Sequence, residues 1–425
     1  MNTEDLRFKT SAIDLDDEES QKQAAQNFDL KNLPANFFEN PYPYYDALLK
    51  YAPILKLPDG GYFLSSYKDL DFVYRNPKIF SSDKRILFKS TMGDSLLFQH
   101  HTHSLVFNDP PLHTRVRKLL GGALSPRAIQ VLEPGLVELV NRLLDNLSTQ
   151  YIKVGSVDLI SDYAAAIPIE IIGNLLGIPH EDRDPLREWS LSILGALEPV
   201  ISPEVFNQGN KSVSDFLEYL KTLISARRAN PRDPTQDVLT QLLQGEHGGE
   251  KLSELELLHN CIFLLNAGHE TTTNLIGNGL VLLMNNKGER ERFLENPQFV
   301  KSAVEEILRF ESSNQLGNRI TTEEVLIGDV LIPANSQITL CIGAANRDQH
   351  KFSNPHNFDI TRENNKHLAF AGGIHTCAGM GLARLEGEIA LSAFFKRFPS
   401  AVLSESPELT GRIRFRGYSK IIARL

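Results

Sequence analysis

The sequence has few cysteines, no excess of basic residues and no long apolar run, and each shortage excludes a class of protein. Three cysteines in 425 residues, an odd number, do not suggest a disulfide framework. A formal net charge of −9 disfavours a general nucleic-acid binder, because binding to phosphates needs a basic surface. No stretch is apolar for long enough to span a bilayer or to form the core of a signal peptide. We therefore expect a soluble, cytoplasmic protein without a membrane anchor.

Internal repeats and low-complexity linkers are also missing, which favours one integrated domain. Residues 1–30 are polar, with a strongly acidic run at 14–19, and we expect them to form a loose leader before a single domain over 31–425. The composition, 41% hydrophobic and 23% charged, is ordinary for a globular protein. The length leaves ample material for a large core around a buried cofactor.

The spacing of apolar residues predicts a mainly α-helical chain with a small β-rich region. Helical spacing is found at 42–50, 67–75, 132–147, 163–176 and 213–227. Strand-like segments are found at 53–57, 62–65, 325–332 and 337–342. Helix-breaking Gly195, Pro199 and Pro203 predict an interrupted connection near residues 191–205.

Residues 80–108 show no clear periodicity, and we expect them to be irregular. They contain His100, His101 and His103. Closely spaced histidines can bind a metal ion, but no supporting set of cysteines or carboxylates follows at a useful spacing. We therefore expect an exposed loop or the wall of a pocket.

The loop at 370–379 places Cys377 among small residues, directly before a helix-forming sequence that starts at Met380. Glycines allow tight turns and a close approach of the backbone to a flat cofactor. Backbone N–H groups at a helix start favour negative charge, so we expect a lowered thiol pKa and a thiolate ligand. The alternative for a lone cysteine is a buried, inert side chain, which is what we expect of Cys261 and Cys341.

A long apolar segment at 253–285 predicts a buried helix, and Ser253 with Glu256 forms a capping box at its start. Its middle, 266–273, is polar, and buried polar groups cost free energy unless they are hydrogen-bonded. Gly268 removes side-chain bulk, so that a flat ligand or O2 can approach.

The carboxyl group of Glu270 and the hydroxyl group of Thr271 could together pass protons to a bound oxygen species. Thr271 or Thr272 can also bond back to a helix carbonyl. The alternative is a set of polar core groups that satisfy one another.

Two further helices carry charged residues at helical spacing. His113 and Arg117 are four residues apart and share one face, which could present hydrogen-bond donors to a propionate-bearing cofactor or simply face solvent. Glu306 and Arg309 are three apart and can pair, although such a pair on the surface contributes only about 0–1 kcal/mol.

Together these motifs resemble those of the cytochrome P450 family, in the order of its soluble bacterial members, over about residues 35–425. The loop matches at Phe370, Gly373, His375, Cys377 and Gly379. One departure is Ala371, where many members carry glycine; alanine fits there if the position does not need a positive φ.

The resemblance implies the cytochrome P450 fold, with haem b between the 253–285 helix and the Cys377 loop. Cys377 as the axial iron ligand is a property of the family and does not follow from the spacing. The other implied haem contacts are His113, Arg117, Ala267, Gly268, Arg319, Phe370, Gly373, His375 and Gly379. Glu270 and Thr271 are the implied catalytic pair, and Glu306, Arg309 and Arg362 the implied structural network.

The implied activity is that of a monooxygenase, which inserts one oxygen atom of O2 into a C–H bond of a lipophilic small molecule. No flavin or iron–sulfur motif is present, so we expect electrons from a separate ferredoxin and NAD(P)H-dependent reductase. We expect the ferredoxin to dock on the thiolate-side face, at Arg115, Lys118 and Arg384. The implied substrate-pocket positions are Leu97, Phe98, Leu194, Ala267, Leu316 and Tyr418.

Three alternatives stay open at this point. They are a peroxide-driven haem-thiolate peroxygenase, a non-catalytic haem-binding protein, and a cysteine hydrolase that uses Cys377 and His375. The acid–alcohol pair argues against the first two. The hydrolase leaves the polar centre of the long helix without a role.

Overall fold

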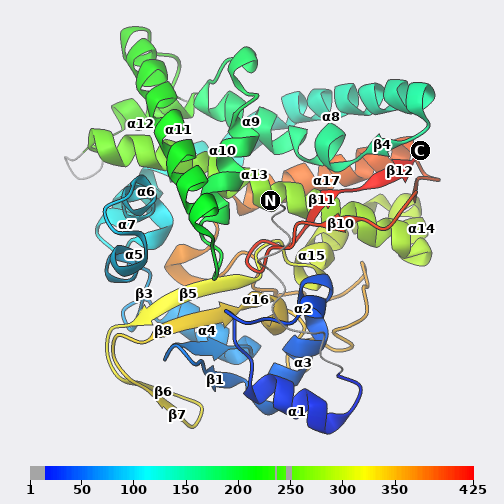
Figure 1. Cartoon of the computed structure of the whole chain (residues 1–425). Coiled ribbons are helices and arrows are strands. Elements are labelled where there is room, and N and C mark those ends of the chain that lie inside the picture. Colours follow the sequence, from blue (N-terminus) through cyan, green and yellow to red (C-terminus); the bar gives the residue numbers. More distant parts are fainter. Residues whose placement is uncertain (1–14, 235–236, 246–250) are drawn as a thin grey trace.

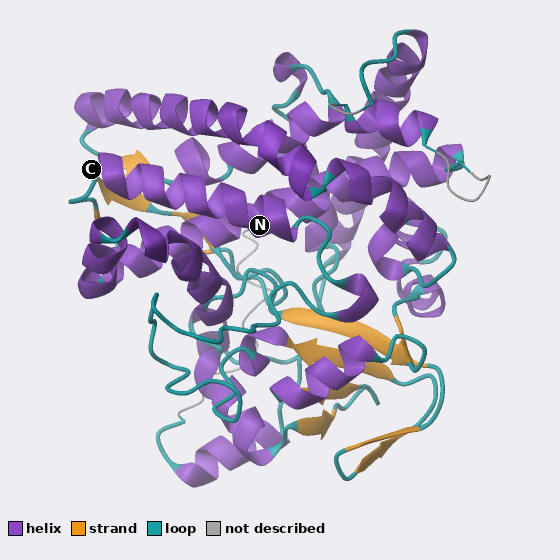
Figure 2. Cartoon of the chain, turned by 180° about the vertical axis from the view of Figure 1, so that it is seen from behind, coloured by secondary structure: helices purple, strands orange, loops and turns teal. Residues whose placement is uncertain are grey.

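Helices make up most of the chain, and the strands gather toward one end of the molecule (Figures 1 and 2). The structure, a computed structural model, describes residues 15–234, 237–245 and 251–425. Among these residues no helix is both long and apolar enough to cross a membrane. The mainly helical architecture with small sheets confirms the fold class expected from the sequence.

The helices have the following bounds: α1 (Glu18–Gln26), α2 (Ala35–Glu39), α3 (Tyr42–Tyr51), α4 (Tyr67–Arg75), α5 (Arg85–Met92), α6 (Leu96–His103), α7 (Leu112–Ala123), α8 (Pro126–Val154), α9 (Ala166–Leu176), α10 (Leu186–Gly195), α11 (Pro203–Ala229), α12 (Val238–Gln244), α13 (Glu254–Asn285), α14 (Lys287–Glu295), α15 (Val300–Phe310), α16 (Ile342–Ala345) and α17 (Met380–Arg397).

The strands have the following bounds: β1 (Ile54–Lys56), β2 (Tyr62–Leu64), β3 (Phe80–Ser81), β4 (Val157–Asp158), β5 (Leu316–Thr321), β6 (Val325–Ile327), β7 (Val330–Ile332), β8 (Gln337–Cys341), β9 (Val402–Leu403), β10 (Glu408–Leu409), β11 (Tyr418–Lys420) and β12 (Ile422–Arg424).

The long helix α13 runs through the middle of the helical part and contacts α6, α9, α10, α11 and α17. Its capping box forms as predicted, because the side chain of Ser253 accepts from the N–H of Glu256 and the carboxylate of Glu256 accepts from the N–H of Ser253. Most of its side chains are buried, as expected of a helix that is apolar nearly all round. α13 is therefore held in place by its packing and offers a rigid surface to neighbouring groups.

The largest sheet has five strands in the order β1-β2-β8-β5-β3. β2 and β8 are parallel, and β5 pairs antiparallel with β8, with Leu316 opposite Cys341 and Arg319 opposite Ile338. In Figure 1, β5 lies on the side of this sheet that faces the helical part of the molecule.

The expected loose leader is not loose where the structure describes it. α1 begins after Asp17, whose side chain accepts from the N–H of Ser20, and it contacts α3. Ala25, Phe28 and Leu30 are buried in a cluster with residues of α3. Apolar side chains at these positions outweigh the acidic run that suggested a solvated leader. Residues 1–14 lie outside the described part.

Residues 80–108 are not irregular, since they form α5 and α6. The side chain of Ser95 caps α6 by accepting from the N–H of Phe98. Both helices are only eight residues long, so they offer too few turns for apolar periodicity to stand out.

The predicted interruption near 191–205 is confirmed, since α10 ends at Gly195 and α11 begins at Pro203. The two helices pack against each other. Trp189 of α10 stacks on Phe216 of α11, with ring centroids 5.0 Å apart and planes at 30°.

Candidate functional site

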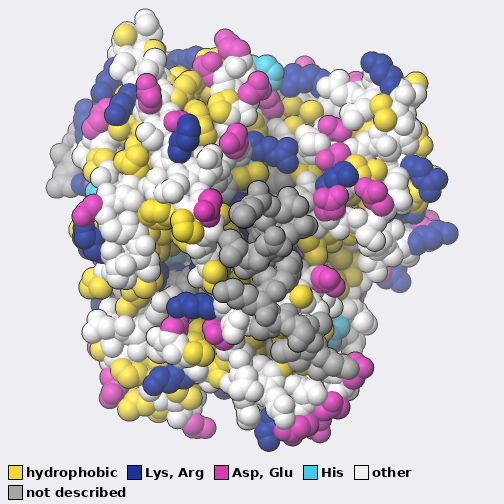
Figure 3. All heavy atoms as spheres, viewed as in Figure 1, with side chains coloured by type: hydrophobic (Ala, Val, Ile, Leu, Met, Phe, Trp, Pro, Cys, Tyr) yellow, Lys and Arg dark blue, Asp and Glu magenta, His cyan; other side chains and the backbone are white. Residues whose placement is uncertain are grey.

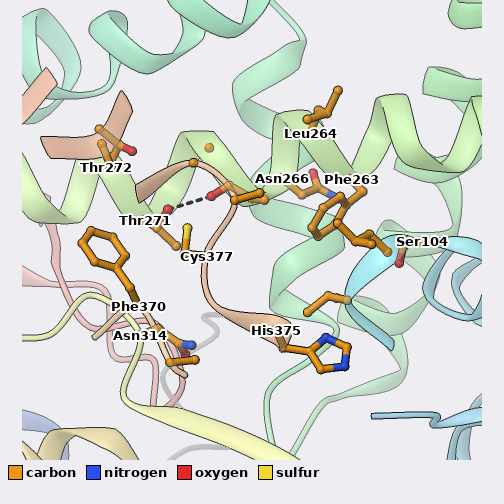
Figure 4. A pocket seen from close by; sticks show the side chains of 18 of the residues that line it. Ser104, Phe263, Leu264, Asn266, Thr271, Thr272, Asn314, Phe370, His375 and Cys377 are labelled. Atoms are coloured by element: carbon orange, nitrogen blue, oxygen red, sulfur yellow. Dashed lines mark hydrogen bonds between the residues drawn. The ribbon is translucent and has the colours of Figure 1, made fainter. Parts of the chain in front are cut away.

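A cavity of about 350 Å³ lies beside α13 and collects residues from distant parts of the chain. Its lining comes from α6, α9, α13, β5, the Cys377 loop and the segment before β11, and is mainly apolar. Figure 4 shows Thr271 of α13 and Cys377 of the loop on neighbouring parts of this lining, with Phe370 close by. A cavity of this size is typical of a small-molecule site.

Cys377 is held by its loop immediately before α17. Its N–H donates to the carbonyl of Phe370 at 3.0 Å. Gly373 has a φ of +66°, and a Cβ there would lie 2.0 Å from the carbonyl oxygen of Tyr74, so only glycine fits. The loop geometry therefore depends on the backbone of α4 as well as on its own glycines.

The expected lowering of the Cys377 pKa is not found. Burial raises the pKa of this thiol, while a hydrogen bond from the N–H of Gly379 and the charges of Arg117 and Arg384 oppose the rise. The prediction considered only the helix start and left out the loss of water around the sulfur. A metal cation bound directly to Sγ of Cys377 would favour the thiolate form of this side chain.

Ala371 has a φ of +55°, in the left-handed region that favours glycine. The condition under which alanine was expected to fit, no need for a positive φ, is thus not met. A side chain in this conformation costs about 1–2 kcal/mol. The N–H of Ala371 donates to the carbonyl of Leu368 at 2.8 Å, which holds the turn in place.

Five basic side chains gather at one end of the cavity, and we call them the basic cluster: Lys84, His113, Arg117, Arg319 and His375. The rings of His113 and His375 are 4.2 Å apart. Within the described chain, both ring nitrogens of His113, Nε2 of His375 and Nζ of Lys84 are buried without a hydrogen-bond partner.

The electrostatics of the basic cluster point to a missing anion. Burial is the main cause that lowers the pKa of Lys84 well below its ordinary value and that of His375 to about 2, and Arg319 contributes to both shifts. The nearest carboxylate oxygen recorded for His375, on Asp109, is 4.0 Å from its Nε2, too far for a hydrogen bond. Haem propionates would supply both the charge and the acceptors, so the residues present fit haem.

Lys84 was missed by the sequence analysis because it lies in the segment expected to be irregular. Nothing in its spacing marks it. Only the fold shows that its ammonium group is buried near Arg319.

Thr271 and Glu270, the two residues in the polar centre of α13 that we expected to act together, lie in different surroundings. Thr271 lines the cavity together with Ala267, Gly268 and Thr272, and its Oγ1 donates to the carbonyl of Ala267 at 2.8 Å. The side chain of Ile172 packs into the space beside Gly268, since a Cβ on Gly268 would lie 2.7 Å from Cδ1 of Ile172.

Glu270 does not line the cavity. Its two carboxylate oxygens accept from Nη1 of Arg412 at 2.6 and 2.7 Å, and the side chain is buried. Burial raises the pKa of Glu270 to about 7, although the charge of Arg412 opposes the rise. The acid and the alcohol are therefore neighbours in sequence that face different surroundings, and Arg412 is a partner that spacing could not reveal.

The three residues of the predicted structural network, Glu306, Arg309 and Arg362, are in direct contact. Arg309 donates to both oxygens of Glu306 at 2.7 and 2.8 Å, and Nε of Arg362 donates to the same carboxylate at 3.0 Å. Glu306 and Arg309 are fully buried, and Arg309 also donates to the carbonyls of Asn346 and Pro355. This network ties α15 to the chain that leads into the Cys377 loop.

Three of the six predicted pocket positions, Leu194, Ala267 and Leu316, line the cavity. Leu97, Phe98 and Tyr418 do not. Leu97 packs against α11 beside Gly209 and Phe98 lies near Lys89, because α6 turns its later residues toward the cavity.

His100 and His101 line the cavity, so the pocket wall, one of the two expectations for their segment, is confirmed. The lining residues that the sequence analysis missed include Asn266, Glu386 and Phe415. Phe415 takes the place expected for Tyr418, which belongs to β11. Glu386 is buried, and burial raises its pKa to about 8.

The expected docking residues are less available than the sequence suggested. Arg115 pairs with Glu256, and Nε of Arg384 lies 2.6 Å from a carboxylate oxygen of Glu305. Lys118 is exposed. On the face seen in Figure 3, acidic and basic side chains are intermixed.

Comparisons with known proteins identify the family to which the chain is similar. A family model described as Cytochrome P450 matches residues 50–412. The biotin biosynthesis cytochrome P450 of Bacillus subtilis is 36% identical over 381 residues, which cover 87% of this chain and 92% of that protein. A vitamin D(3) 25-hydroxylase of Pseudonocardia autotrophica is 37% identical over 373 residues, covering 87% and 89%.

Solved structures show the same likeness. The structure of P450BioI in complex with a hexadec-9Z-enoic acid-ligated acyl carrier protein matches with a TM-score of 0.86 and 34% identity, over 92% of this chain and 100% of that one. A Bacillus megaterium cytochrome in complex with testosterone matches with a TM-score of 0.82 and 29% identity, over 91% and 98%.

Proposed function

Because this chain belongs to the cytochrome P450 family and is a haem monooxygenase of that family, we propose that it hydroxylates a lipophilic small molecule with electrons from a separate ferredoxin and reductase. The observation that carries this proposal is the mainly apolar cavity that has Cys377 and Thr271 in its lining. Bound haem supplies the activation of O2 and the insertion of one oxygen atom into a C–H bond.

The proposed roles around the cofactor follow from the contacts. Cys377 ligates the iron, and the basic cluster binds the propionates, with Lys84 added to His113, Arg117, Arg319 and His375. The cavity-lining residues Ala267, Gly268, Phe370 and Gly379 stand against the macrocycle, and Gly373 shapes the loop. The Glu306–Arg309–Arg362 network holds the loop in place and takes no part in the chemistry.

Thr271 is the proposed last proton donor, since its hydroxyl group is at the cavity. Glu270 is proposed to resupply that proton from behind the helix. Its carboxylate is bound to Arg412, so it has to turn away from this arginine before it can hand on a proton. A pKa of about 7 allows Glu270 to carry a proton near neutral pH.

The substrate class rests on the lining and on the relatives. Apolar side chains such as Leu194, Phe263, Leu316 and Phe415 make up most of the surface that a substrate would touch. The names of similar proteins mention vitamin D(3), a hexadecenoic acyl group and testosterone, compounds whose skeletons are largely hydrocarbon. For the ferredoxin we propose a face on the thiolate side that includes the exposed Lys118.

The deciding experiment records the absorption of the reduced, carbon-monoxide-treated protein and of a Cys377→Ser variant. We expect the red-shifted band of a thiolate-ligated haem in the first and its loss in the second. The same protein is then supplied either with a ferredoxin and its reductase or with hydrogen peroxide. Turnover with peroxide alone would favour a peroxygenase, and a normal band without turnover under any condition would favour a non-catalytic haem protein.

A further inference from the structure

Among the polar groups in the mainly apolar lining of the cavity, His100 and His101 of α6 and Asn266 of α13 form what we call the polar corner. All three side chains are at most 3% exposed. Asn266 lies five residues before Thr271, about 7.5 Å along the helix axis. Figure 4 shows Asn266, with Phe263 and Ser104, farther along the cavity than Cys377 and Thr271.

This polar corner is incompletely hydrogen-bonded. The amide Nδ2 of Asn266 lies 3.4 Å from Nε2 of His100. Within the described chain, Nδ1 of His100, Nε2 of His101 and Oδ1 of Asn266 are buried with no partner. Leaving one buried polar atom unpaired costs about 1–3 kcal/mol, so unpaired atoms in a small-molecule cavity favour a ligand that bonds to at least one of them.

The corner carries no charge of its own. Burial lowers the pKa of His101 to about 3 and that of His100 well below its ordinary value, so both rings are neutral near pH 7. When Nε2 of His100 accepts from Asn266, its Nδ1 carries the proton. Its Nδ1 then points away from Asn266, and the free group beside this contact is an acceptor, Oδ1 of Asn266.

Among the described residues that line the cavity, we find no cation at the polar corner that could balance a carboxylate. Arg414 also lines the cavity, but its guanidinium donates to the carbonyls of Leu197 and Leu316 and to Oδ1 of Asn318, at 2.7–3.0 Å. The other arginines that line the cavity, among the described residues, belong to the basic cluster.

We propose that the polar corner binds an uncharged hydroxyl group on an otherwise lipophilic substrate. The hydroxyl group donates its hydrogen to Oδ1 of Asn266, and His100 holds the amide of Asn266 in place through its Nε2. The hydroxyl group fixes one end of the substrate, so that oxidation falls on a carbon at a set distance from it. This inference rests on the proposed function, because it names the substrate class of that same cavity.

The test uses the haem-loaded full chain and equilibrium dialysis, which needs no turnover. The probes are 1-adamantanol, adamantane and adamantane-1-carboxylate, which share one rigid skeleton. We expect the alcohol to bind about tenfold more tightly than the hydrocarbon, and the carboxylate to bind no better than the hydrocarbon.

Two variants probe the corner separately, so that a folding failure in one leaves the other informative. In His100→Phe and in Asn266→Leu we expect the alcohol-to-hydrocarbon ratio to fall to about one, while binding of adamantane itself changes little. His100→Gln keeps an acceptor for the amide of Asn266 and should restore part of the ratio.

The matched control is His103→Phe, on the same helix. The Nδ1 of His103 lies 2.7 Å from the carbonyl of Gln99, and the residue does not line the cavity. This variant should leave the ratio unchanged. An equal affinity for alcohol and hydrocarbon in the unmodified protein, or an unchanged ratio in both corner variants, would overturn the proposal. If the reduced, carbon-monoxide-treated protein lacked the thiolate band, the proposed haem function would be rejected. Dialysis would still measure the alcohol-to-hydrocarbon ratio, so the two failures can be told apart.

Discussion

The Glu306 network and the basic cluster are both buried groups of charged side chains near the Cys377 loop, yet only one is complete. In the network, Glu306 accepts from Arg309, Arg362, Asn365 and the N–H of Asp359. In the basic cluster, five basic side chains lie together, and several of their nitrogens have no partner in the described chain.

The difference separates a structural role from a binding role. A buried charge is tolerated only where it is paired, so a closed network is already stable in the protein alone. An open cluster of one sign is destabilising until an anion arrives. The two groups should therefore respond in opposite ways when one charge is removed.

The largest effect is expected for Glu306→Gln. This change leaves two buried guanidinium groups facing a neutral amide, which costs about 3–5 kcal/mol of unfolding free energy. Urea unfolding followed by circular dichroism measures it. The control is Glu254→Gln, which breaks a half-exposed pair with Arg228 and should cost no more than about 1 kcal/mol. Equal losses of unfolding free energy in Glu306→Gln and Glu254→Gln would contradict a structural role for the Glu306 network.

Glu270 is an intermediate case, with a single arginine partner, and its stability contribution should depend on pH. Its pKa is about 7 in the folded protein against an ordinary value of 4.5, so the folded state holds the proton more tightly. The contribution of Glu270 to the free energy of unfolding is fully present below pH 4.5. It decreases by up to about 3 kcal/mol as the pH rises to 7.

Comparing the unmodified protein with Glu270→Gln across this pH range isolates the effect, because the variant cannot titrate there. Thermal unfolding at each pH is the measurement. Arg412→Met should enlarge the loss, since it removes the opposing charge. A constant difference between protein and variant from pH 4.5 to 7 would contradict the assignment.

Removing a charge from the basic cluster should have the opposite sign to Glu306→Gln. Arg319→Leu relieves repulsion and should leave the unfolding free energy of the protein unchanged or slightly higher. It should also speed the loss of haem about tenfold, since one charge-assisted bond to a propionate is gone. Transfer of haem to an excess of apomyoglobin gives the rate. Arg397→Leu, which breaks an exposed pair with Asp145, is the control.

The smallest effect is expected at Ala371, in the loop that carries Cys377. Ala371→Gly removes the strain of a positive φ but adds backbone freedom to the unfolded chain, so the net stabilisation should be at most about 1 kcal/mol. Ala369→Gly, at a residue without a positive φ, should destabilise. A loss of stability in both variants would show that the strain at Ala371 is negligible.

The sequence predicted the parts of the site that are encoded locally. The capping box at Ser253, the pairing of Glu306 with Arg309 and the glycine-rich loop around Cys377 each depend on residues a few positions apart. For the same reason the long helix and the motif order were readable, and the comparisons confirm the family to which they pointed.

What the sequence could not show depends on distant contacts. Arg412 lies 142 residues after Glu270, and only the fold brings the two together. Lys84 lies directly before α5, and His100 and His101 lie in α6; their burial comes from packing and not from the local sequence pattern. Burial also reversed the expected pKa shift of Cys377, because desolvation is a property of the folded surroundings.

The stacking of Trp189 on Phe216 has a practical consequence, since the chain contains one tryptophan. Its fluorescence reports on the contact between α10 and α11 without any added label. Separation of the two helices would wet the indole and move its emission to longer wavelength, so rapid mixing with a ligand can time the opening and closing of this part of the molecule.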